Sequence, residues 1–170
     1  AARQHGGFVV YMNAPQERVA IFFDGSNVYN RLKELKIYNL LKYDYRGLAG
    51  LLSRGRPIVS LHYFVGAVRT RKDDTQSQEL RRQQQKLFSR LTGSGFLVEC
   101  GYMLNTGERY HEKGVDVKIA IDLLVGAYED LYDTAILVSS DTDLIPAVEQ
   151  VKKMKKQVEY VGFGHKPSFA

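Results

Sequence analysis

The sequence predicts an α/β domain in which a mostly parallel, five-stranded sheet is doubly wound, with a layer of helices on each face. Two observations carry this prediction. Short runs rich in β-branched and aromatic residues alternate along the chain with longer amphipathic stretches, which is the pattern of βαβ units. The runs are almost continuously apolar, as in parallel sheets whose strands are covered on both faces. We therefore expect a three-layer fold with crossover connections.

The first half of the chain predicts two strands and two helices. Residues 18–23 and 57–65 concentrate Val, Ile, Phe and Tyr, which favour strands. Apolar residues at helical spacing predict helices at 29–36 and 44–53. These elements make up the first strand, its crossover and the second strand.

The second half repeats the pattern three more times. We expect strands at 95–102, 134–138 and 157–163, and helices at 75–91, 115–128 and 144–155. The segment 103–113 is too polar and too short for another βα unit, and we expect a turn or a small hairpin there. In the helix at 115–128, Ile119 and Leu123 fall on one stripe, whereas Lys118 and Glu129 lie elsewhere.

Length and composition fit one globular domain. The chain has 170 residues, of which 44% are hydrophobic and 25% charged. Roughly 70% of the surface of an unfolded chain of this size can be buried on folding, which allows a core without disulfides. Residues 1–16 contain a Gly-Gly pair and a proline, and we expect them to be a loosely attached lead-in to a single domain at 17–170.

Cys100 is the only cysteine of the chain. One thiol cannot form an internal disulfide, and no Asn-x-Ser/Thr sequon is present, so nothing indicates an oxidising compartment. We expect Cys100 to be a small buried apolar residue. Because no apolar run approaches the roughly 18 residues that a membrane span needs, we expect a cytoplasmic protein with no membrane partner.

The charge balance favours a polyanionic partner. Lys and Arg number 24 against 19 Asp and Glu, a formal net charge of +5. The densest basic region includes Arg69, Arg71 and Lys72. This loop leaves the carboxyl end of the second predicted strand, where it can hold phosphate groups. For the basic residues at 81–90 we expect a solvated helix face.

Acidic side chains directly follow two of the predicted strands. Asp24 follows the first strand, and Asp141 and Asp143 follow the fourth. In an open parallel sheet, ligands bind beyond the carboxyl ends of the strands, where the strand order reverses. If the fourth strand lies beside the first, these acids converge. Asp116 opens a helix that runs antiparallel to the strands and therefore begins at the same edge.

Three or four carboxylates in one crevice repel one another unless a cation lies among them. Oxygen ligands without His or Cys suit Mg²⁺ or Mn²⁺ and not zinc. Such an ion binds phosphate oxygens and lowers the pKa of a bound water. We expect the metal ligands to be Asp24, Asp116, Asp141 and Asp143. Asn27 offers a neutral amide that can hold a ligating water or a phosphate oxygen.

Each acid also has a purely structural interpretation. An Asp between a strand and a helix is usually an N-cap, and Asp116 at a helix start also complements the helix dipole. The joint placement of the acids is what favours a metal site. Asp122, six residues after Asp116, points to another side of the helix, and we expect it to pair with a Lys or Arg.

Three motifs occur in order along this βα pattern: FDGSN at 23–27, KGVDVK at 113–118 and VSSDTDL at 138–144. Together they resemble the NYN domains of the LabA-like group, within the PIN-like nucleases, over about residues 18–163. Ser140 stands where glycine is commoner in the third motif. The resemblance implies a sheet ordered 3-2-1-4-5. It also implies a metal site on Asp24, Asp116 and Asp141, assisted by Asn27 and Asp143.

Members of this group studied as enzymes are metal-dependent ribonucleases. The resemblance thus implies RNA cleavage. We expect an endoribonuclease that hydrolyses RNA with a metal-activated water and has single-stranded RNA as its partner. The basic loop with Arg69, Arg71 and Lys72 is expected to contact that RNA. A homo-oligomer is left open. The alternative is a non-catalytic module that keeps the fold and binds RNA or a protein. A binding module gains nothing from four clustered acids that face a polyanion, which favours the enzyme.

Two other enzyme or ligand-binding classes share the opening motif. A haloacid-type phosphatase needs a second Asp two residues after Asp24, and Ser26 stands there. A metal-dependent adhesion site needs Asp-x-Ser-x-Ser, and Val28 stands at the fifth position. Both classes are disfavoured by these residues.

Overall fold

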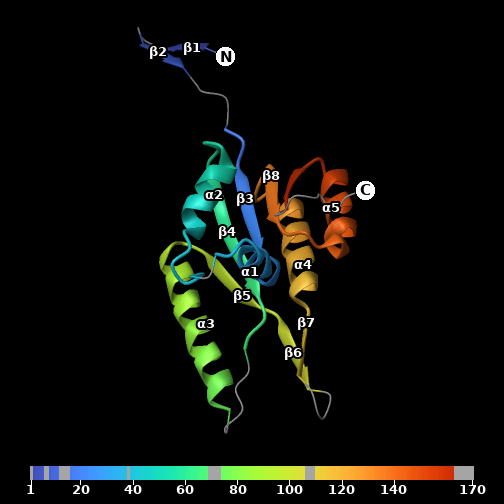
Figure 1. The fold of residues 1–170 in the computed structure, drawn as a ribbon. Coiled ribbons are helices and arrows are strands. Elements are labelled where there is room, and N and C mark those ends of the chain that lie inside the picture. Colours follow the sequence, from blue (N-terminus) through green and yellow to red (C-terminus); the bar gives the residue numbers. More distant parts are fainter. Residues whose placement is uncertain are drawn as a thin grey trace.

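A five-stranded sheet forms the centre of the computed structural model, which describes residues 2–5, 8–11, 16–37, 39–68, 74–105 and 110–162. Its strands are β3 (Val19–Asp24), β4 (Ile58–Val65), β5 (Leu97–Cys100), β8 (Thr134–Val138) and β9 (Gln157–Val161). They lie in the order β5-β4-β3-β8-β9, and all four pairings are parallel. Numbered along the chain, this is the expected order 3-2-1-4-5 (Figure 1).

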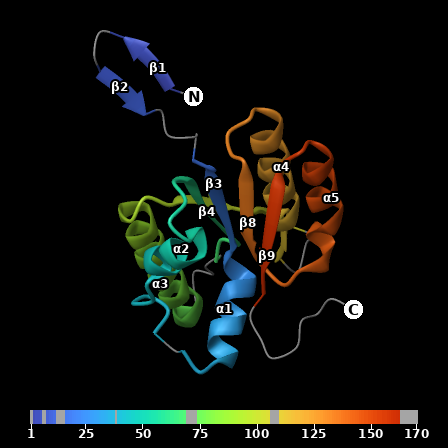
Figure 2. The same cartoon turned by 90° about the horizontal axis from the view of Figure 1, so that it is seen from above.

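Helices cover both faces of this sheet (Figure 2). On one side lie α1 (Gly25–Glu34), α2 (Tyr45–Ser53) and α3 (Thr75–Gly93), and on the other α4 (Val115–Tyr128) and α5 (Ile145–Lys153). A short 3-10 turn, η1 (Thr142–Leu144), precedes α5. The predicted three-layer α/β class is therefore confirmed. Within the described residues, no helix is both long enough and apolar enough to cross a bilayer.

Two antiparallel hairpins lie outside the main sheet. β6 (Tyr102–Asn105) pairs with β7 (Tyr110–Lys113), which confirms the small hairpin expected between the third strand and α4. β1 (Ala2–His5) pairs with β2 (Phe8–Tyr11) in the segment interpreted as a lead-in. These two N-terminal strands were not expected from the sequence.

The central strand β3 explains the continuous apolar runs. All six of its residues are buried. Val19, Ile21 and Phe23 pack in the cluster below α1, α2 and α3, whereas Ala20 and Phe22 pack in the cluster below α4 and α5. Because successive side chains of a strand point to opposite faces and both faces are covered, the five residues ahead of Asp24 are all apolar. Each Å² of apolar surface that is buried in this way stabilises the folded state by about 25 cal/mol.

The boundaries differ from the expected ones at two places that matter. α1 begins at Gly25, four residues before the expected 29, because the carboxylate of Asp24 accepts a hydrogen bond from the backbone N–H of Asn27 and caps the first turn. β5 is shorter than the expected strand at 95–102.

The expectation that Cys100 is buried is wrong. This residue is exposed at the end of β5, which is an edge strand.

Gly25 sits where the chain passes from β3 into α1, against the neighbouring strand. A Cβ atom there would lie 2.5 Å from the Tyr63 ring and 2.6 Å from the carbonyl oxygen of Phe64. Since the backbone of β4 cannot move away cheaply, we expect Gly25→Ala to lower the free energy of unfolding by about 1–3 kcal/mol. Urea unfolding would measure the change, with Gly50→Ala as the control, because a Cβ at Gly50 meets nothing within 4 Å. Equal effects of both substitutions would contradict this expectation.

Candidate metal centre

Three aspartates from different parts of the chain meet at the carboxyl edge of the sheet. Asp24 ends β3, Asp141 follows β8, and Asp116 lies in the first turn of α4. One carboxylate oxygen of each lies within 4.8 Å of the others. β3 and β8 are the neighbours between which the strand order reverses, the place where open α/β sheets bind ligands. The site therefore arises from the topology.

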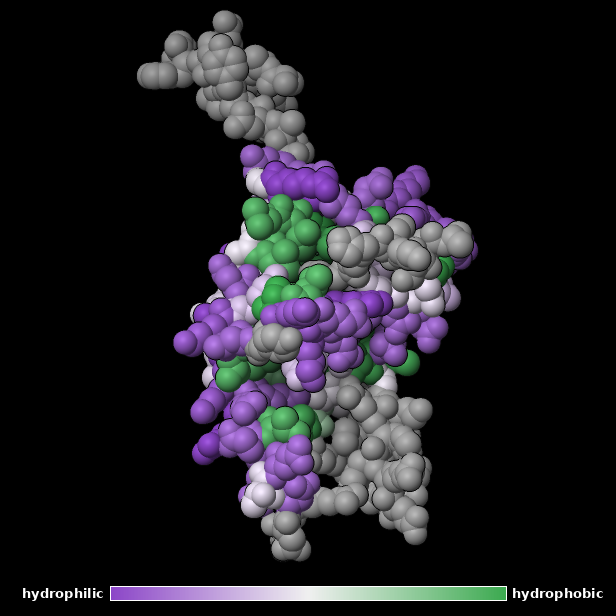
Figure 3. All heavy atoms as spheres, in the orientation of Figure 1, coloured by the Kyte–Doolittle hydropathy of each residue, from purple (hydrophilic) through white to green (hydrophobic). Residues whose placement is uncertain are grey.

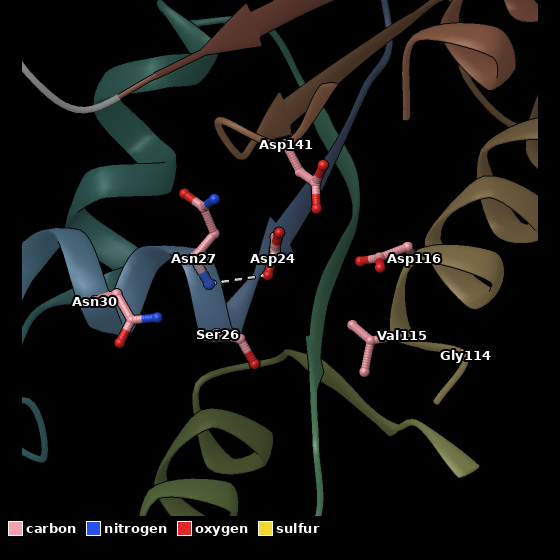
Figure 4. Close-up of a pocket in the computed structure, with 8 residues that line it drawn as sticks. All are labelled: Asp24, Ser26, Asn27, Asn30, Gly114, Val115, Asp116 and Asp141. Carbon is pink, nitrogen blue, oxygen red and sulfur yellow. Dashed lines mark hydrogen bonds between the residues drawn. The ribbon is translucent and has the colours of Figure 1, made fainter. Parts of the chain in front are cut away.

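The carboxylates line one open crevice of about 380 Å³ (Figure 4). Its walls come from the start of α1, the start of α4 and the loop after β8. They consist of Asp24, Ser26, Asn27, Asn30, Gly114, Val115, Asp116 and Asp141. In Figure 4 the side chains of Asp24, Asp116 and Asp141 point toward a common space between β3 and α4. The crevice is thus acidic in the middle and neutral and polar along α1.

Asp24 is the most buried of the three, with 4% of its surface exposed. Its Oδ1 accepts from the N–H of Asn27 at 3.0 Å, and its Oδ2 accepts from the hydroxyl of Ser139 at 2.8 Å. Burial raises the pKa of Asp24 although these hydrogen bonds oppose the shift, and the charge of Asp141 raises it further. The N-cap interpretation is confirmed. It is compatible with a metal site, because capping fixes the carboxylate in one orientation.

Ser139 connects Asp24 to Asp141 through hydrogen bonds. No role was predicted for it from the sequence. The residue is fully buried at the end of β8. Its Oγ donates to Asp24 and accepts from the backbone N–H of Asp141 at 3.0 Å. The hydroxyl of Tyr160 on β9 donates to the backbone carbonyl of Asp141. A hydroxyl-bearing residue directly ahead of the acidic motif is a signal that could have suggested this role.

Asp141 and Asp143 occupy different positions. The Oδ1 of Asp141 accepts from the N–H of Asp143 at 2.9 Å and so caps the 3-10 turn η1. Asp143 is exposed and does not belong to the group of three converging oxygens. Its negative charge nevertheless contributes to the field at Asp116. Asp143 is a neighbour of the carboxylate group instead of a member of its centre.

Asp116 is the exposed member of the group. Partial burial raises its pKa, and the charges of Asp141, Asp24 and Asp143 raise it further, in that order. Gly114, with φ 90°, precedes α4 and provides no side-chain cap. Asp116 lies in the first turn of this helix, at the positive end of the helix dipole. The mutual effect of three negative charges shows that the group would gain from a cation.

Asn27 connects the two motifs that carry Asp24 and Asp141. Its backbone N–H donates to Asp24, and its side-chain Oδ1 accepts from the N–H of Ser140 at 3.2 Å. The amide therefore fixes the loop after β8 against the start of α1. Ser26 and Asn30 add further neutral hydrogen-bonding groups to the same wall (Figure 4).

The donor set suits a hard cation. It consists of carboxylate oxygens, with no His or Cys among the three converging ligand atoms, and such sets favour Mg²⁺ or Mn²⁺. The open crevice leaves space for water and a substrate beside the ion, as a catalytic site requires. The residues present thus fit a divalent metal.

A second group of possible ligands, on the α4 face of the sheet, already has a lysine as its cationic partner. His62, Glu99 and Asp122 also bring ligand atoms within 4.8 Å of one another. However, the ammonium of Lys118 pairs with Glu99 and lies 3.3 Å from Asp122. This confirms the expectation that Asp122 pairs with a Lys or Arg.

The basic loop expected to contact phosphate lies outside the described residues. Arg69, Arg71 and Lys72 all belong to this undescribed stretch. The helix that follows is described, and Arg82, Lys86 and Arg90 on α3 are exposed, as expected for a solvated face.

The strand order and the acidic crevice define this protein as a PIN-like α/β domain. The sequence profile of the NYN domain family matches residues 18–170, and the chain belongs to that family. A crystal structure of a protein of unknown function from Vibrio parahaemolyticus is similar, with 26% identity and a TM-score of 0.66 over 89% of this chain and 85% of that chain. A comparison with curated proteins gave no match.

Proposed function

We propose that this domain is a metal-dependent endoribonuclease of the LabA-like group, with Mg²⁺ or Mn²⁺ as its cofactor. The observation that carries the proposal is the convergence of Asp24, Asp116 and Asp141 within 4.8 Å in an open crevice. NYN family membership associates such a site with PIN-like nucleases. The residues Arg69, Arg71 and Lys72, a single-stranded RNA substrate and a cytoplasmic location belong to the same proposal.

The chain's own residues have distinct roles in this proposal. Asp24, Asp116 and Asp141 would hold the cation, with Asp143 adding negative charge beside them. A bound divalent cation lowers the pKa of a water molecule and neutralises charge on a phosphate group. Ser139 and Asn27 keep the ligands in place through the hydrogen bonds that they make. Ser26 and Asn30 offer neutral donors to a substrate in the crevice, where another acid would repel it.

The second candidate is a non-catalytic module that uses the same fold to bind RNA or a protein. A buried carboxylate such as Asp24 has a raised pKa and so costs folding free energy when it is ionised. A module without a metal gains nothing in return for that cost, whereas a metal site does. The geometry therefore supports the enzyme better.

Cleavage of labelled single-stranded RNA in the presence of Mn²⁺, Mg²⁺ or EDTA tests the proposal. We expect cleavage that depends on the metal, in which water attacks phosphorus and the 3′ oxygen leaves, so that the products carry 5′-phosphate and 3′-hydroxyl ends. Products with a 2′,3′-cyclic phosphate would overturn the proposed chemistry. RNA binding without cleavage at any metal concentration would favour the binding module.

We expect the affinity for Mn²⁺ to decrease as the pH falls. The pKa values of Asp24 and Asp116 are both raised in the metal-free protein, so each carboxyl keeps its proton to a higher pH than usual. A cation must displace those protons, and affinity is therefore complete above the raised pKa values and lost below them. Calorimetric titration between about pH 4 and pH 8 would measure the effect. An affinity that stays constant over this range would contradict it.

A further inference from the structure

The outer side of α1 carries an aromatic ring and a lysine next to the crevice. Ser26 and Asn30 of this helix line the crevice. Tyr29 and Lys33 lie beside them, because residues three or four positions apart are neighbours on the surface of a helix. At 3.6 residues per turn, the four side chains fall within an arc of about 100°. We call these four residues the α1 track.

α1 extends outward from the carboxyl edge of the sheet, so the α1 track leads away from the crevice (Figure 2). Val28 and Leu32 bury another side of the helix in the core. From Ser26 to Lys33 the track rises by about 10 Å along the helix axis. All four of its residues are exposed, and the surface over α1 is hydrophilic at the centre of the view in Figure 3. The track is thus an open polar surface that continues one wall of the crevice.

Lys33 is the cation of α1 that no carboxylate neutralises. Arg31 pairs at 2.8 Å with Glu34, which is the only acid of this helix. Lys33 makes no ion pair with any described residue, and its Nζ lies 5.7 Å from the centre of the Tyr29 ring. A lysine in the last turn of a helix also interacts favourably with the helix dipole. That interaction leaves the ammonium group exposed and able to contact a phosphate.

We propose that the α1 track binds the stretch of single-stranded RNA that adjoins the phosphate in the crevice. A base stacks on the ring of Tyr29, which is 44% exposed, and the ammonium of Lys33 contacts a phosphate of the backbone. Aromatic side chains combined with positive charge hold single strands with little dependence on their sequence. This inference rests on the proposed function, because it takes RNA to be the ligand of the crevice.

The acidic crevice by itself is a poor binding surface for RNA. Its three converging carboxylates repel a polyanion when no cation lies among them. On α4, which begins at the opposite wall, Lys118 is paired with Glu99 and Asp122. Lys33 therefore supplies unpaired positive charge on the α1 side. A base can stack on Tyr29 only when it is free of its own base pair, which favours a single strand over a duplex.

Binding of a fluorescently labelled single-stranded RNA of about 12 nucleotides tests the α1 track. Fluorescence anisotropy measures the affinity in EDTA, where no metal-dependent cleavage occurs. We expect Tyr29→Ala to weaken binding by about 5- to 20-fold, whereas Tyr29→Phe, which keeps the ring, binds as the unaltered chain does. Lys33→Ala should weaken binding by about 2- to 5-fold at low salt. It should also reduce the slope of log affinity against log salt concentration by about 0.7, the value for one phosphate contact on a single strand.

Lys153→Ala is the matched control. Lys153 is also an exposed lysine in the last turn of a helix, α5, and it does not line the crevice. The substitution removes the same charge as Lys33→Ala but lies outside the α1 track. It should therefore leave the affinity and the salt slope unchanged. Circular dichroism shows that each variant is folded.

Two results would overturn the α1 track. One is RNA binding that Tyr29→Ala and Lys33→Ala affect no more than Lys153→Ala does. The other is an unaltered chain that does not bind the RNA in EDTA. Cleavage with Mn²⁺ is measured separately, so cleavage together with either result rejects the track and keeps the proposed nuclease. Binding that depends on Tyr29 and Lys33 without any cleavage keeps the track and rejects the nuclease.

Discussion

Asp24→Asn is expected to abolish metal-dependent RNA cleavage. The change replaces a ligand oxygen by an amide and removes one of three negative charges within 4.8 Å. The local structure should remain, because Asn also caps helices and its Oδ1 can still accept from the N–H of Asn27. The hydroxyl of Ser139 can turn to accept from the new amide. We expect cleavage to fall by more than about 100-fold, beyond the loss that outer partners of metal ligands cause.

The stability of this variant separates loss of chemistry from loss of fold. Burial raises the pKa of Asp24, so its ionised form opposes folding in the metal-free protein at neutral pH. Removing the charge should leave the melting temperature of metal-free Asp24→Asn equal to or above that of the unaltered chain. Calorimetry of both proteins, each with EDTA and with Mn²⁺, measures this. Mn²⁺ should stabilise the unaltered chain and not the variant.

Asp44→Asn is the matched control for that experiment. Asp44 caps α2 as Asp24 caps α1, accepting from the N–H of Gly47 at 2.8 Å, but it is exposed and lies outside the crevice. It should retain full cleavage and full stabilisation by Mn²⁺. If Asp24→Asn cleaves RNA as well as Asp44→Asn does, the site is not the one proposed.

Ser139→Ala is expected to reduce the affinity for Mn²⁺ by about 10- to 100-fold, with a matching loss of cleavage at low metal concentration. The hydroxyl touches both Asp24 and the backbone of Asp141. Without it, the buried Oδ2 of Asp24 and the N–H of Asp141 each lose a partner. The two carboxylates can then drift apart, and a cation must gather them again when it binds.

The neighbouring hydroxyl offers a control for this prediction. Ser140 is half-buried, and it contributes its backbone N–H, not its side chain, to the bond with Asn27. Ser140→Ala should therefore bind Mn²⁺ as the unaltered chain does. A saturating metal concentration should restore cleavage by Ser139→Ala, since the ligands themselves remain. Equal metal affinities of the two alanine variants would show that Ser139 does not position the site.

Local patterns predicted the helices and strands whose apolar spacing is most regular. Residues 115–128 form a helix with the expected bounds, and residues 134–138 form the expected strand. Both have strong periodic or continuous apolar patterns, which depend only on neighbours in the chain. The start of α1 was placed too late because its first turn, Gly-Ser-Asn, has low helix propensity and forms through the cap of Asp24.

The candidate site was predictable in outline for a topological reason. Asp24 and Asp141 each follow an apolar strand, and parallel strands bring their carboxyl ends to one edge. That β8 lies beside β3 is shown by the structure. The exact membership of the group was not predictable. Asp143 follows the same strand as Asp141 but lies exposed in a 3-10 turn, outside the group of three converging oxygens.

Patterns of adjacent residues were enough to predict the alternation of elements, the fold class and the acidic residues at the strand ends. Which groups touch depended on how the chain packs. Ser139 meets Asp24 across 115 positions of the chain, and Lys118 on α4 pairs with Glu99 on β5. Which side of α4 is exposed followed only from the packing of Ile119 and Leu123 on the sheet. Contacts between distant segments depend on packing in three dimensions, and no local periodicity encodes them.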